Sequence, residues 1–61
     1  MEERLLRRRQ VEELTGLSRA SIYRLMGKDR FPQPVKVSDT AVRWKLSDIA
    51  TWIESRPVSR I

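Results

Sequence analysis

Three side chains that can donate hydrogen bonds to anions lie in a stretch of the chain that holds no acidic residue. Arg19, Arg24 and Lys28 lie in this stretch, between Glu13 and Asp29. A guanidinium group can donate two parallel hydrogen bonds to one planar acceptor edge, and both arginine and lysine bind phosphate. The same residue types also occur on ordinary solvated helix faces. The stretch therefore predicts either a polyanion-binding surface or a solvated helix.

The overall charge favours a polyanion as partner. The 61 residues include 13 Lys and Arg against 8 Asp and Glu, which gives a formal net charge of +5 at pH 7. A positive field of this size attracts polyanions, of which nucleic acid is the commonest in a cell. A basic surface that only keeps the protein in solution is the alternative from charge alone.

The composition argues against catalysis. The chain has no His and no Cys, so it lacks the imidazole base, the thiol nucleophile and the usual zinc ligands. We therefore expect no enzyme activity, no catalytic residue, no metal and no cofactor. The acidic beginning of the chain differs from a signal peptide, and no apolar run has the length of a membrane span. These features predict a cytoplasmic protein without a membrane segment.

Two short helices and a tight turn are predicted to position the cationic stretch. The first helix is expected at about Arg8 to Thr15, with Val11 and Leu14 on its inner face. Gly16 follows where a residue of positive φ would end this helix. Leu17 is expected to close the corner against the core.

The second helix is expected at about residues 19–27, with Ser18 as its N-cap. Ile22, Leu25 and Met26 recur at helical spacing and form its buried stripe, which leaves Arg24 at the centre of the opposite face. The candidate recognition residues on and beside that face are Ser18, Arg19, Ala20, Ser21, Tyr23, Arg24 and Lys28.

The middle of the chain predicts a β-hairpin, because residues 35–37 and 42–44 alternate between apolar and cationic residues around a turn. Its expected apolar side comprises Val35, Val37, Val42 and Trp44, and its outer side Lys36 and Arg43. The preceding Pro32 and Pro34 favour an extended connection, with Phe31 in the core. A ligand for a proline-recognising domain is the alternative for this segment.

A last helix is expected to begin with Ser47 as its N-cap and to end before Pro57. Its inner stripe is predicted to be Ile49, Trp52 and Ile53. Both tryptophans are interpreted as core residues, because so short a chain needs large apolar side chains. Flexible ends are expected at about 1–4 and 57–61, with Leu5 and Leu6 as the first apolar anchor.

The predicted order is helix, helix, two-stranded hairpin, helix, which is the layout of a small α+β winged helix-turn-helix domain. In that layout the second helix enters the major groove of DNA and the hairpin acts as the wing. Arg24 is the first candidate for reading a guanine. The wing candidates are Lys36, Ser38, Thr40 and Arg43, and candidate phosphate contacts are Arg7, Arg8 and Arg9. A solvated helix end is the alternative for the triple arginine, and the charges alone favour it.

The sequence resembles the AlpA-type regulators of phages and prophages, which have a winged-helix fold of the excisionase or MerR-like kind. The residues that carry the resemblance are Val11, Thr15-Gly16-Leu17-Ser18-Arg19, Ile22-Tyr23-Arg24-Leu25, Phe31-Pro32-x-Pro34-Val35-Lys36, Trp44, Ser47-Asp48-Ile49 and Trp52. The resemblance implies DNA binding, with Arg19, Ser21, Tyr23 and Arg24 on the reading helix and Lys36 on the wing. The chain departs from the family pattern at Ser38-Asp39-Thr40, where glycine is common, and at Ala20, where many relatives carry a hydroxyl.

We therefore expect a single DNA-binding domain over residues 1–61 that binds double-stranded DNA sequence-specifically as a transcriptional regulator. An excisionase that bends attachment-site DNA is the alternative within this class. A protein-interaction module, such as an anti-repressor, is the alternative from another class. Expected partners are DNA, a second copy of the chain as a homodimer or in cooperative assembly, and a phage integrase or RNA polymerase.

Overall fold

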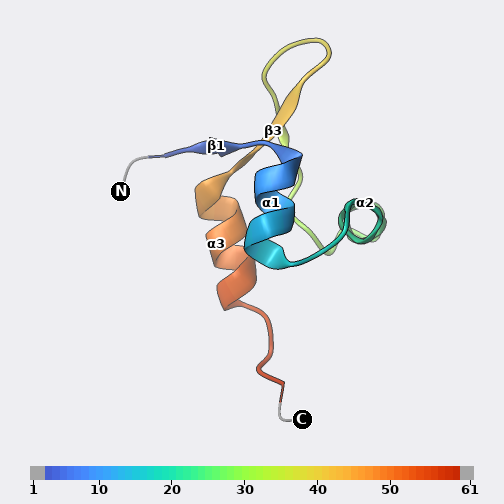
Figure 1. Cartoon of the computed structure of the whole chain (residues 1–61), viewed down its shortest axis with the longest axis vertical. Coiled ribbons are helices and arrows are strands. Elements are labelled where there is room, and N and C mark those ends of the chain that lie inside the picture. The colour runs from blue at the N-terminus through green and yellow to red at the C-terminus, as the bar shows by residue number, and fades with distance from the viewer. Residues whose placement is uncertain (1–2, 60–61) are drawn as a thin grey trace.

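A three-stranded antiparallel sheet carries the helices on one of its faces (Figure 1). The computed structural model describes residues 3–59. Its elements are β1 (Leu5–Leu6), α1 (Arg8–Thr15), α2 (Arg19–Gly27), β2 (Val35–Lys36), β3 (Val42–Lys45) and α3 (Leu46–Glu54). The fold is the predicted small α+β winged helix-turn-helix, with one strand more than the sequence indicated.

The helix-turn-helix agrees with the sequence prediction in its boundaries and in its turn. Gly16 ends α1 with a φ of 73°, a left-handed conformation that a side chain would disfavour. Ser18 caps α2, because its hydroxyl oxygen accepts a hydrogen bond from the Ser21 backbone N–H at 3.2 Å. Leu17 packs against the core from the turn, as expected.

The additional strand is β1, which pairs with β3 so that the strand order is β1-β3-β2. Leu5 lies opposite Lys45, and Leu6 lies opposite Trp44. Leu6 is buried and Leu5 is exposed, so the predicted apolar anchor consists of one residue of the pair. A two-residue strand has too few residues to show a period in the sequence, which is why only the pairing with β3 reveals it.

The beginning of α3 corrects two predictions. Ser47 is inside the helix, and Lys45 occupies the N-cap position without a side-chain hydrogen bond. The cap comes from the other end of the chain: the Leu46 N–H donates to the Arg4 carbonyl at 2.8 Å, and the Ser47 hydroxyl donates to Glu3 Oε1 at 2.8 Å. Residues 3 and 4 are therefore held in place. Residues 1–2 and 60–61 of the expected flexible ends lie outside the described residues.

The register of the hairpin also differs from the prediction. Val35 lies opposite Arg43, and Lys36 lies opposite Val42. Because directly opposed residues share a face and successive residues alternate, Lys36 lies on the face of Trp44, whereas Arg43 lies on the other face. The predicted apolar side and the predicted outer side were therefore both wrong, because the pairing across the turn offsets the two alternating patterns.

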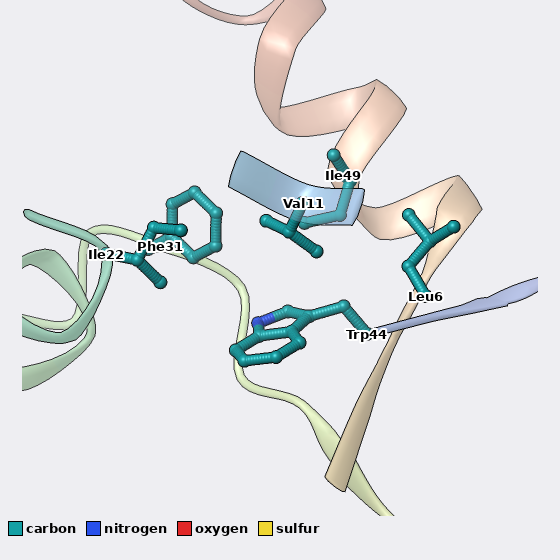
Figure 2. Close-up of a cluster of buried hydrophobic side chains, with 6 residues drawn as sticks. All are labelled: Leu6, Val11, Ile22, Phe31, Trp44 and Ile49. Atoms are coloured by element: carbon teal, nitrogen blue, oxygen red, sulfur yellow. The ribbon is translucent and has the colours of Figure 1, made fainter. Parts of the chain in front are cut away.

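Six side chains form the core between the sheet and the helices (Figure 2). They are Leu6, Val11, Ile22, Phe31, Trp44 and Ile49. Trp44 is 1% exposed and donates its indole N–H to the Pro32 carbonyl at 3.0 Å. Trp52 packs beside this core, with its ring centroid 4.7 Å from that of Phe31. These contacts support the structural interpretation of the tryptophans and of the proline segment.

Two predicted inner-face residues are turned outward. Leu14 of α1 is 51% exposed, and Ile53 of α3 is 39% exposed. Both helices are short, and each reaches the core through one fully buried residue, Val11 or Ile49. Each helix therefore contacts the core along a narrow stripe, and a second residue of that helix is not fully buried.

Replacement of the two neighbouring leucines of β1 tests the register. We expect Leu6→Ala to lower the free energy of unfolding by about 2–4 kcal/mol, because it leaves a cavity beside Trp44. Leu5→Ala removes a half-exposed side chain and should cost less than about 1 kcal/mol. Urea denaturation of both variants measures the two losses. Equal losses would contradict the register.

The Glu3 cap predicts a pH-dependent contribution to stability. The hydrogen bond from the Ser47 hydroxyl, against an opposing effect of desolvation, lowers the pKa of the Glu3 carboxyl from its ordinary value. A carboxyl whose pKa is lower in the folded state stabilises the fold above its ordinary pKa, and this stabilisation is lost as the pH falls through the lowered pKa. We expect Glu3→Gln to lower Tm at neutral pH.

Thermal melts of Glu3→Gln and the unsubstituted chain, from neutral pH to about pH 3, follow this difference. The difference in Tm between the two proteins should shrink towards zero in acid, where the side chain at position 3 is uncharged in both. A difference that stays constant across the range would show that the charge of Glu3 contributes nothing.

Candidate nucleic-acid interface

The outward face of α2 carries the predicted recognition residues. Figure 1 shows α2 end-on, set apart from α1 and α3, which run along the vertical. Ile22 is buried, and Leu25 and Met26 pack against the core beside it. The residues turned outward are Arg19, Ala20, Tyr23 and Arg24, all exposed. Burial of the apolar stripe thus presents the cationic face to solvent, as the helical spacing predicted.

A short chain of hydrogen bonds connects the N-cap of α2 to the centre of this face. The Ser18 hydroxyl lies 3.1 Å from the Ser21 hydroxyl, and Arg24 Nη2 lies 3.4 Å from the same Ser21 oxygen. Ser18 is already committed to the cap. Ser21 therefore holds the Arg24 guanidinium from the N-terminal side, which reduces the conformational freedom of an exposed side chain.

Arg19 and Tyr23 form a second pair, one helical turn apart. The Arg19 guanidinium carbon lies 5.8 Å from the centre of the Tyr23 ring, within the range of a cation–π contact. Tyr23 is 44% exposed. The pair places an aromatic surface and a positive charge side by side at the flank of α2.

The C-terminal end of α2 is closed by an unusual turn. Lys28 is the C-cap residue, and its N–H donates to the Arg24 and Leu25 carbonyls. Asp29 has a φ of 59°, and the Arg30 N–H returns to the Leu25 carbonyl at 2.8 Å. Lys28 and Arg30 are both exposed. Sequence reasoning missed Arg30 as a candidate, and only its charge next to Lys28 could have indicated it.

The wing candidates are divided by the register of the hairpin. Lys36 is exposed and lies on the face of the sheet that carries Trp44. Arg43 is half-buried on the opposite face, where its Nη1 donates to the Val42 carbonyl at 2.8 Å. The structure therefore does not bring Lys36 and Arg43 together on one face of the sheet.

The tip of the wing is an exposed turn at one end of the molecule (Figure 1). The Val37 N–H donates to the Ala41 carbonyl at 3.0 Å and closes it. Ser38 and Thr40 are exposed, and the Thr40 N–H points to the Ser38 hydroxyl at 3.4 Å. The exposed Asp39 between them carries a negative charge at the tip.

The three consecutive arginines have different surroundings. Arg8 Nε lies 2.8 Å from Glu12 Oε2, and this is the one ion pair among residues 3–59. Arg7 and Arg9 are exposed. Arg9 lines a shallow hollow together with Gly16 and Ser18, so it lies beside the N-terminal end of α2. Glu12 and Glu13 line the same hollow, so the surface beside Arg9 carries charges of both signs.

Residues 3–59 contain no group of three His, Cys, Asp or Glu side chains that could hold a metal ion. Within the same range, no helix has the length and apolar character needed to cross a bilayer.

Comparison with known proteins agrees with the sequence resemblance. The family model described as prophage CP4-57 regulatory protein (AlpA) matches residues 4–57. An uncharacterized protein of Enterobacteria phage P4, ORF88, is 39% identical over 59 residues, which cover 97% of this chain and 67% of the relative. No solved structure matches the chain. Since the family match extends from β1 to beyond the end of α3, this chain belongs to the AlpA family of prophage regulatory proteins.

Proposed function

We propose that the protein binds double-stranded DNA sequence-specifically as a phage-type transcriptional regulator. The observation that carries this proposal is the exposed, acid-free face of α2, on which Ser21 holds the Arg24 guanidinium. An α-helix fits the major groove, and a helix-turn-helix presents its second helix there. Membership of the AlpA family supports the same conclusion.

Within this proposal Arg24 reads base edges. It lies at the centre of the exposed face, and its guanidinium can donate to O6 and N7 of one guanine. Ala20 is a small residue of the same outward face. It allows close approach to the DNA and offers its methyl group to a thymine methyl. Arg19, Tyr23 and Lys28 flank these positions and contact phosphates, which orients the helix without reading sequence.

The wing and the start of α1 supply further phosphate contacts. Lys36 is exposed on the hairpin, and we assign it a contact with the DNA backbone. Arg9 borders the N-terminal end of α2, in a hollow that Glu12 and Glu13 also line, and of the three arginines it is the one to which we assign a phosphate contact. Arg43 lies on the opposite face of the sheet, and we assign it a smaller contribution than Lys36.

We propose that the protein acts by binding alone, without catalysis, metal or cofactor. The lack of His and Cys in the chain supports this. Its partners would then depend on where it binds. Sites that overlap a promoter would place it beside RNA polymerase, whereas sites in attachment-site arms would place it beside an integrase and favour the excisionase alternative.

Selection of bound sequences from a random duplex library, followed by salt titration on the selected site, tests DNA binding. We expect the affinity to fall steeply with salt, because each neutralised phosphate releases counterions. If no duplex binds even at low salt, the DNA-binding proposal fails and a protein-interaction module takes its place.

Substitution of Arg24 tests base reading. We expect Arg24→Ala to lower affinity for the selected site by about 1–3 kcal/mol and to relax preference at one base pair. Lys36→Ala, which removes a proposed phosphate contact, should weaken binding to all sequences alike and reduce the salt slope by about 1. Binding measurements on the selected duplex and its single-base variants separate the two effects. An unchanged preference in the Arg24 variant would refute its role.

Substitution of Ser21 tests whether it positions Arg24. We expect Ser21→Ala to reduce affinity for the selected site by about 3- to 10-fold, the loss of one hydrogen bond, and to leave non-specific binding unchanged. Thr51→Ala, which removes an exposed hydroxyl from α3, is the matched control. A loss in the Arg24→Ala background as large as in the unsubstituted chain would show that Ser21 acts independently of Arg24.

A further inference from the structure

We infer that a groove between α1, β1 and the beginning of α3 binds a second copy of this chain. The groove has a volume of about 380 Å³, and we refer to it as the α1–α3 groove. Its lining residues are Arg4, Leu6, Gln10, Glu13, Leu14 and Leu46. None of them belongs to α2, β2 or β3, so an occupant would leave these elements uncovered, although Glu13 also lines the hollow beside Arg9.

The groove contains apolar surface that the fold itself does not use. Leu14 follows Val11, the buried residue of α1, at helical spacing, yet its side chain is 51% exposed. Leu46 is half-buried at the other wall, and Leu6 lies between them as part of the core. Apolar side chains gathered at one groove gain free energy when a complementary surface removes them from water.

The charges at the groove select a second copy as the occupant. Arg4 and Glu13 are both exposed, carry opposite charges and line the same groove. The one ion pair within residues 3–59 is Arg8 with Glu12, so neither charge is paired inside this part of the chain. A two-fold axis brings each patch against its own copy, and an axis that passes midway between Arg4 and Glu13 places Arg4 of one copy against Glu13 of the other, twice. A uniformly acidic or basic partner would oppose one of the two charges.

The size of the groove predicts that the pairing is weak in solution. Six residues line it, whereas a stable interface takes about 20–30 residues from each side. Two copies with a net charge of +5 each also repel one another. We therefore expect a dissociation constant on the order of 0.1–1 mM for the free protein, an affinity of about 4–5 kcal/mol. The pairing itself does not rest on the proposed DNA binding.

Charge exchange across the two-fold axis tests the pairing without DNA. Arg4→Glu places two carboxylates against each other, and Glu13→Arg places two guanidinium groups against each other. Each variant alone should therefore stay monomeric. An equimolar mixture of the two should associate, because both contacts across the axis are then between opposite charges. NMR translational diffusion from about 0.05 to 1 mM measures association for each variant, the mixture and the unsubstituted chain.

Two control variants define the outcome. Asp39→Arg makes the same change in net charge as Glu13→Arg but lies at the wing tip, and it should leave association unchanged. Leu14→Ser should abolish association, and circular dichroism should show that it folds, since its side chain is half exposed. The proposal is overturned if the unsubstituted chain stays monomeric at the highest concentration or if the mixture associates no more than its components. The groove would then be left to a different protein.

Discussion

Burial of the Trp44 indole connects β1, β3 and the three helices of this small fold. Trp44 lies opposite Leu6 of β1, and its indole N–H holds the Pro32 carbonyl after α2. In the core it lies with one residue from each helix, Val11, Ile22 and Ile49 (Figure 2). A chain without disulfides or metal ligands depends on such a contact, because its short helices are unstable by themselves.

The cationic face of α2 follows from this packing. Once Ile22 is buried against the core, the helical period directs Arg24 outward, and the Ser18 cap fixes where the helix begins. Ser21 then lies within reach of both Ser18 and Arg24. The core and the proposed DNA-reading surface are thus opposite sides of one nine-residue helix, so selection for one constrains the other.

Contacts between the N-terminal segment and the beginning of α3 give the fold its second constraint. The carbonyl of Arg4 and the carboxylate of Glu3 satisfy N–H and O–H groups at the start of α3, which local residues leave uncapped. The same N-terminal segment supplies β1 and one wall of the α1–α3 groove. The N-terminal residues therefore support both the sheet and the surface that we propose for self-association.

Features set by neighbouring residues could be predicted from the sequence. The bounds of α1 and α2, the positive φ of Gly16 and the Ser18 cap all depend on contacts within a few positions. Family membership likewise follows from residues quoted in order along the chain. The predicted DNA-binding residues on α2 are brought to one exposed face because a single helical period determines their directions.

Only the tertiary structure decided the features that depend on pairing between distant residues. The register of β2 with β3 places Lys36 and Arg43 on opposite faces, and the alternating pattern of each strand is compatible with either register. The strand β1 and the Glu3 cap join positions more than 35 residues apart, which no local period reports. Leu14 has the spacing of an inner residue, yet it is exposed because the short α1 meets the core at Val11 alone. The sequence by itself thus determined the helices and the charged face of α2, and tertiary packing determined how the wing and the N-terminal segment are arranged around them.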